Sequence, residues 1–152
     1  MRVLNTFMLA IGKLPCDFSA MMSPDQFREI VVPSIRRLVP RFEHVFYHLD
    51  GKDCIKHIPA ILEIEQIRVI QWTPGAGQAG ALDESWYPLF DRIRSAGRGL
   101  WLRVTGDSLR DMVQSAQEFI CRYGSAGIFL RFPEMSEGEG EALIEAATRH
   151  GG

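Results

Sequence analysis

The chain has 152 residues, 46% of them hydrophobic and 24% charged, and its formal net charge is −2. These values suit one soluble domain with a sizeable core. They argue against nucleic acid or an anionic membrane as a partner, because either would be attracted by a basic surface. Cys16, Cys54 and Cys121 form no CxxC pair, which favours reduced thiols in a cytoplasmic protein over a disulfide framework. The apolar opening run ends at Lys13 and is too short to span a bilayer.

The first helix is predicted to begin at Ser23. Residues 1–22 sustain no apolar period, so we expect a poorly defined lead-in there. Ser23 and Gln26 have the spacing of a capping box. A helical stripe of apolar residues then continues to Leu38, and Pro33 is expected to kink this helix because proline has no backbone N–H.

Four strand–helix units follow the first helix. The predicted strands are 43–49, 68–72, 99–104 and 127–132, and the predicted helices are 53–64, 84–96, one after Ser108 and one after Ser136. Regular alternation of this kind predicts parallel strands joined by right-handed crossovers. The expected fold is therefore one α/β domain over residues 1–152, with a helix and four βα units over 23–152.

Each predicted strand has polar side chains on one face, near its C-terminal end. Alternate residues of a strand point to opposite sides, so His48 and Asp50 share a face. Burying such groups costs several kcal/mol unless partners or a ligand satisfy them. Functional sites of parallel α/β folds gather at the C-terminal edge of the sheet. We therefore predict one pocket that contains His48, Asp50, Gln71, Arg103 and Arg131.

The residue types in this pocket indicate two kinds of chemistry. His48 and Asp50 could share a proton or a metal ion, which makes them the candidate catalytic and metal-binding residues. Arg103 and Arg131 suit a ligand that carries a carboxylate or phosphate. Structural alternatives remain open: a core histidine bonded to a carbonyl group, an Asp-Gly turn, and arginines paired with helix carboxylates.

The loop GAGQAG at 75–80 has the GxGxxG spacing of a dinucleotide-binding fingerprint. That motif needs a helix that begins inside the glycines, whereas the predicted helix begins after Asp83. A ligand-facing loop is therefore favoured, and a nucleotide-binding α/β domain is kept as an alternative. The candidate substrate-binding residues here are Thr73, Gly75, Gly77 and Gln78, in addition to Gln71, Arg103 and Arg131.

The runs HVFYHLDG and IQWTPGAGQ, with CDFSAMMSPDQFREIVVPSIRRL before them, resemble the C-terminal half of the uroporphyrinogen decarboxylase-like family over about residues 16–150. That family includes uroporphyrinogen decarboxylase and corrinoid-dependent methyltransferases. The resemblance implies half of a TIM-type (β/α)8 barrel, with a decarboxylase (lyase) or methyltransferase site at the strand ends. The implied ligands are a porphyrin-type tetrapyrrole or a methyl donor brought by a corrinoid protein. The methyltransferases bind zinc through a His-x-Cys motif; here Asp50 replaces that cysteine, which leaves His48 and Asp50 to hold a metal such as zinc.

A half-barrel has consequences for assembly. A closed barrel needs about 250 residues and eight strands, so four βα units make half of one. Two unpaired sheet edges and an open apolar face would invite association. We therefore expect a homodimer or a fragment of a longer chain. A non-catalytic half-barrel that serves as an interaction module, and an open sheet with helices on both sides, are the alternatives.

Overall fold

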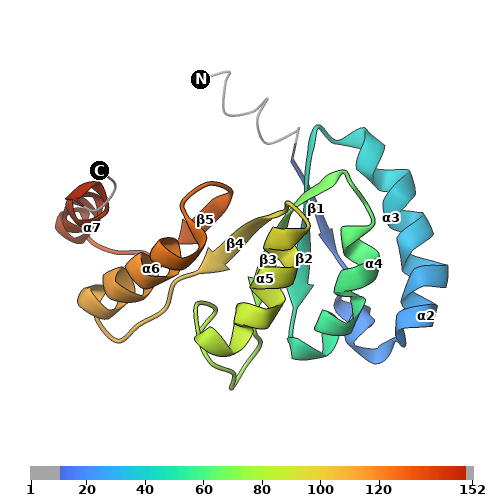
Figure 1. Ribbon diagram of the computed structural model, residues 1–152, viewed down its shortest axis with the longest axis horizontal. Coiled ribbons are helices and arrows are strands. Elements are labelled where there is room, and N and C mark those ends of the chain that lie inside the picture. The colour runs from blue at the N-terminus through green and yellow to red at the C-terminus, as the bar shows by residue number, and fades with distance from the viewer. Residues whose placement is uncertain (1–10, 150–152) are drawn as a thin grey trace.

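The computed structural model describes residues 11–149 as an α/β protein with a five-stranded, all-parallel sheet (Figure 1). The strands follow one another across the sheet in chain order. They are β1 (Ile11–Pro15), β2 (His44–Asp50), β3 (Ile67–Thr73), β4 (Gly99–Arg103) and β5 (Ile128–Arg131). The helices are α2 (Pro24–Gln26), α3 (Val32–Leu38), α4 (Ile58–Leu62), α5 (Tyr87–Ser95), α6 (Leu109–Tyr123) and α7 (Glu137–Arg149).

The strand β1 corrects the prediction of a four-stranded sheet preceded by a helix. It pairs in parallel with β2, from Ile11 opposite His44 to Pro15 opposite His48. The strand is short and contains glycine and proline, which are poor strand formers away from a sheet edge. Glycine is needed here for packing, because a Cβ atom at Gly12 would lie 2.6 Å from Cγ of Phe42. The formation of β1 therefore depends on its pairing with β2 and not on a local sequence pattern.

The predicted first helix is present, with its capping box. The Ser23 side chain accepts a hydrogen bond from the Gln26 N–H at 3.2 Å, and Gln26 Oε1 accepts one from the Ser23 N–H at 2.9 Å. The turn before Pro33 is π-helical over Phe27–Val31. Pro33 has no N–H to donate, and the wider turn accommodates that missing bond.

The next two helices begin later than predicted, and proline explains both delays. A 3₁₀ turn over Lys52–His57 precedes α4, and a 3₁₀ turn over Glu84–Trp86 precedes α5. In each case proline occupies the first turn of the α-helix, where its lack of an N–H costs no hydrogen bond. Within residues 11–149, none of the helices has the length and hydropathy that a membrane crossing requires.

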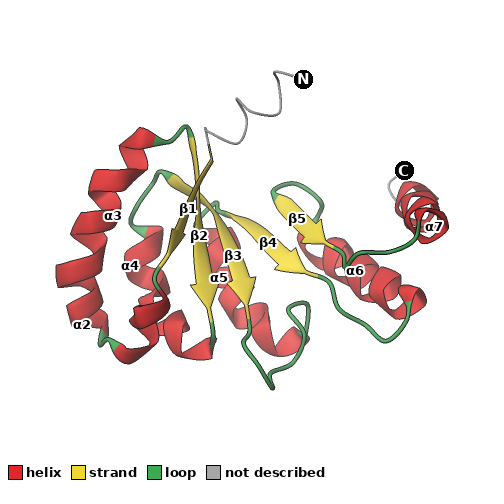
Figure 2. Ribbon diagram, turned by 180° about the vertical axis from the view of Figure 1, so that it is seen from behind, coloured by secondary structure: helices red, strands yellow, loops and turns green. Residues whose placement is uncertain are grey.

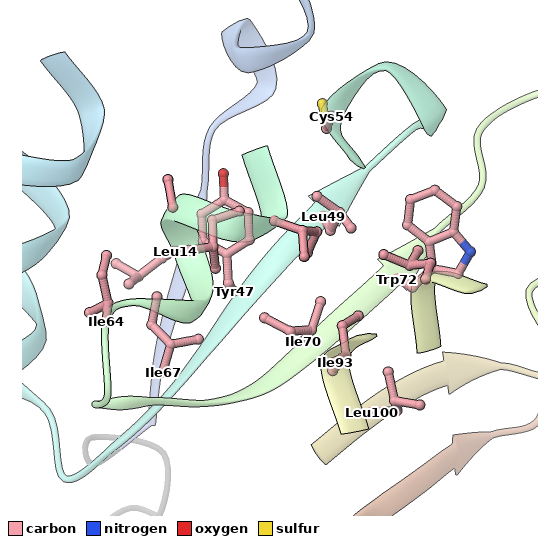
Figure 3. Close-up of a cluster of buried hydrophobic side chains, with 14 of the residues drawn as sticks. Leu14, Tyr47, Leu49, Cys54, Ile64, Ile67, Ile70, Trp72, Ile93 and Leu100 are labelled. Atoms are coloured by element: carbon pink, nitrogen blue, oxygen red, sulfur yellow. The ribbon is translucent and has the colours of Figure 1, made fainter. Parts of the chain in front are cut away.

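The core lies between the sheet and the helices α3, α4, α5 and α6, and the last three of these lie behind the strands in Figure 2. Each connection advances by one strand with the same hand, so these helices reach the same side of the sheet. Side chains from alternate strand positions fill that side (Figure 3). Examples that are fully buried are Leu49, Ile70, Trp72, Leu100 and Leu102.

The opposite side of the sheet is not covered by a helix in the described part of the chain (Figure 2). We call it the open face. Parallel sheets are normally covered on both sides, so an uncovered side is unusual. The open face carries Phe46, His48, Asp50, Val69, Gln71, Thr73, Trp101, Arg103, Phe129 and Arg131.

Candidate functional site

Strand register brings the predicted polar residues into two neighbouring rows of the open face. His48 lies opposite Gln71, and Gln71 lies opposite Trp101. One step closer to the strand ends, Asp50 lies opposite Thr73, and Arg103 lies opposite Arg131. The prediction that these side chains share one face and one edge agrees with this register.

His48 is held by a specific hydrogen bond within the sheet. Its Nδ1 lies 3.0 Å from Oε1 of Gln71, an oxygen that can only accept, so in this hydrogen bond Nδ1–H donates to Gln71. Its Nε2 lies 4.0 Å from Oδ2 of Asp50. The His48 side chain is 16% exposed and the Asp50 side chain 49% exposed. The Nε2 atom of His48 therefore faces a carboxylate near the strand ends.

A pocket of about 570 Å³ occupies this edge of the sheet. Seven of the predicted site residues line it: Asp50, Gln71, Thr73, Gly75, Gln78, Arg103 and Arg131. His48 reaches it through Gln71, and Gly77 lies in the loop beside it without lining it. A hollow of about 630 Å³ also lies beside α6, but its lining comes from that helix alone. Convergent polar groups from several strands distinguish the strand-end pocket as the candidate site.

Trp101 and Thr105 also line the pocket, although they were not predicted as site residues. The signal was present in the sequence, because alternation along β4 places Trp101 on the same side as Arg103, and the same alternation continued past the strand end does so for Thr105. The sequence does not show how far the side chains extend into the cavity, since that depends on the neighbouring loop.

Two tight turns shape the pocket rim. Gly51 has φ 80° and donates its N–H to the Thr73 carbonyl at 2.8 Å, which ties the ends of β2 and β3 together. Asp50 therefore belongs to an Asp-Gly turn and to the pocket lining at the same time. Gly75 has φ 95°, and a Cβ atom there would lie 3.7 Å from Cα of Gly51. The glycine loop thus packs against the first turn.

The glycine loop is anchored at its far end. The Trp86 indole N–H donates to the Gly80 carbonyl at 3.1 Å, and a Cβ atom at Gly80 would lie 2.9 Å from Oγ1 of Thr105. The first helical turn after the loop begins at Glu84, capped by Asp83, whose side chain accepts from the Ser85 N–H. No helix starts within the glycines, as a dinucleotide fingerprint requires.

The side chains of Arg103 and Arg131 make no ion pair or hydrogen bond within residues 11–149. Both are exposed, and they are direct neighbours across β4 and β5. Within this part of the chain, the structure therefore does not contain the alternative arrangement, in which Arg103 and Arg131 pair with helix carboxylates. Two adjacent guanidinium groups repel each other, and a bound anion would relieve that repulsion.

A second histidine shows what a structural histidine looks like in this protein. His57 is 1% exposed and stacks on Phe27 with ring centroids 4.2 Å apart. Its Nε2–H donates to the Ser19 carbonyl at 2.7 Å. Burial lowers the pKa of His57, which keeps the ring neutral. His48, in contrast, belongs to the open face and directs one ring nitrogen toward a carboxylate.

The donor set at His48 and Asp50 falls short of a zinc site. Catalytic zinc uses three protein ligands, whereas these two residues supply two. In the described part of the chain, no group of three or more His, Cys, Asp or Glu side chains is placed to hold a metal ion.

No protein-family model matches the chain, and no curated protein matches it. Its class is therefore defined by fold and site together: an α/β protein with an all-parallel sheet and a polar pocket at the C-terminal strand ends.

Proposed function

We propose that this protein binds a carboxylate-bearing small molecule at the strand ends and decarboxylates it, as a segment of a uroporphyrinogen decarboxylase-like TIM-type barrel. The observation that carries the proposal is the unpaired Arg103–Arg131 pair in the same pocket as Asp50 and Gln71, with His48 bonded behind them. Five parallel strands in chain order, with helices on one side, support the barrel assignment.

The proposed mechanism needs one proton. Decarboxylation breaks the bond from carbon to the carboxylate and forms a C–H bond, so one proton replaces each CO2 released. Arg103 and Arg131 bind a substrate carboxylate, and His48 supplies the proton from Nε2 after taking one up from solvent. Asp50, 4.0 Å away, stabilises the resulting imidazolium, while Gln71 holds the ring in place. Methyl transfer from a corrinoid protein is the second branch of this proposal, and it is favoured if the purified protein contains stoichiometric zinc.

Anaerobic calorimetric titration with a porphyrinogen tests the carboxylate site. Replacing Arg103 with alanine removes a charged hydrogen-bond donor, so we expect affinity to fall by about tenfold or more. Arg92→Ala is the matched control, because Arg92 is an exposed arginine on α5, behind the sheet. Equal affinities of wild type and Arg103→Ala would contradict the proposed site.

The open face favours a second candidate, an interaction module that pairs with a second copy of the chain. A two-fold axis parallel to β3 would place Asp50 of one copy opposite Arg103 of the other and cover Phe129, which is 57% exposed. Light scattering at micromolar concentration should then give twice the chain mass of 17.2 kDa, and Phe129→Ser should shift it toward the monomer. A wild-type monomer that melts cooperatively would rule out this pairing.

A further inference from the structure

Two neighbouring strands of the open face repeat one pattern, an aromatic residue followed two positions later by arginine. Trp101 precedes Arg103 on β4, and Phe129 precedes Arg131 on β5. The register places Trp101 opposite Phe129 and Arg103 opposite Arg131. Two rings therefore lie side by side, with two guanidinium groups one step nearer the strand ends.

The two rings are accessible and continuous with the pocket. Their centroids are 5.2 Å apart and their planes are inclined by 84°. Trp101 is half-buried and lines the pocket, whereas Phe129 is 57% exposed. The Phe46 ring supports Trp101 from the other side, at 4.8 Å. A single exposed phenylalanine is ordinary on a protein surface. Two packed aromatic rings beside two arginines whose side chains have no partner within residues 11–149 are more typical of a binding site.

We infer that Trp101 and Phe129 form a stacking platform and that the pocket takes a flat aromatic carboxylate. The ring of the ligand lies on the platform, and its carboxylate meets Arg103 and Arg131. This inference rests on the proposed carboxylate site and adds the chemical class of the ligand body. It also assigns a binding role to Trp101 and Phe129, which are not among the polar residues predicted for the site.

The geometry favours an aromatic body over an aliphatic one. Because the two ring planes are nearly perpendicular, a flat ring that stacks on one of them meets the other edge-on. Aromatic pairs prefer both arrangements, and they gain energy there beyond what buried area alone provides. A two-residue step along a strand spans about 7 Å, which matches the reach of a two-ring aromatic acid from its carboxylate to its distal ring.

Calorimetric titration with two acids of the same carbon skeleton tests the inference. The probes are 2-naphthoate and its saturated counterpart, decahydronaphthalene-2-carboxylate. We expect wild type to bind the naphthoate about three- to tenfold more tightly, and Trp101→Leu to remove most of that preference. Phe129→Leu serves as a second variant, since its exposed position does not endanger folding. Phe18→Leu, at a 67% exposed phenylalanine outside the platform, is the control.

The outcomes separate this inference from the carboxylate site itself. Equal binding of both acids, with both weakened by Arg103→Ala, would overturn the platform and leave the carboxylate site standing. A naphthoate preference that survives both Trp101→Leu and Phe129→Leu would also overturn the platform. Failure of wild type to bind either acid would overturn both proposals.

Discussion

Replacing His48 with glutamine is expected to slow porphyrinogen decarboxylation by about 10²- to 10⁴-fold, the range that one positioned general acid or base contributes. Glutamine can still hydrogen-bond to Gln71, 3.0 Å from the imidazole in wild type, but it cannot carry the transferred proton. Substrate affinity should change little, because the proposal assigns carboxylate binding to Arg103 and Arg131. Anaerobic measurement of CO2 release, with affinity measured separately, distinguishes the two effects.

Two further variants locate the effect at the proposed proton donor. Asp50→Asn should slow the reaction less than His48→Gln, because Asp50 stabilises the imidazolium without transferring the proton itself. His44→Gln is the matched control, since His44 begins the same strand with its side chain 62% exposed and contacts Glu43. An unchanged rate in His48→Gln would show that the proton comes from elsewhere.

Replacing Trp72 with alanine should lower the free energy of unfolding by about 3–5 kcal/mol. Trp72 is 1% exposed, and it packs on Trp86 with ring centroids 5.0 Å apart, on the helix-covered side of β3 near the end of the strand. Truncation would leave a large cavity beside α5. Since whole domains are stable by about 5–15 kcal/mol, this one change removes a large share. Urea unfolding followed by circular dichroism measures the loss without relying on tryptophan fluorescence.

Trp72→Phe separates lost volume from lost polarity. The Trp72 indole N–H is buried and has no hydrogen-bond partner among residues 11–149, which carries a desolvation cost in the native state. Phenylalanine fills most of the space and removes that cost, so the expected loss is below about 1.5 kcal/mol. Equal losses for the alanine and phenylalanine variants would mean that ring packing is not what stabilises this position.

Strands β2 to β5 and the division of their faces were predictable because the side-chain period of a strand is encoded locally. His48 and Asp50 must share a side wherever that strand lies, and the same holds for Trp101 and Arg103. Helix starts were less predictable. Pro59 and Pro88 occupy the first turns of α4 and α5, but the sequence pattern did not separate these α-helices from the 3₁₀ turns before them.

The remaining features depend on contacts between distant segments. β1 forms because β2 offers an edge and because Gly12 admits the Phe42 ring, and neither fact is visible in the run around Lys13. Similarly, the pocket takes its shape from the glycine loop, which Trp86 fixes through the Gly80 carbonyl. Such long-range contacts leave no period in the sequence.

The chain-order sheet means that each strand depends mainly on the neighbours next to it in sequence, as in a repeat protein. The strands are not equally buried in the core. β3 contributes Ile67, Ile70 and Trp72 at 1% exposure or less, whereas no side chain of β5 is fully buried. We therefore expect transient opening in solution to begin at the C-terminal unit and to spare β2 and β3. Arg131 belongs to the unit that opens first, so the arginine pair is disrupted during each such excursion.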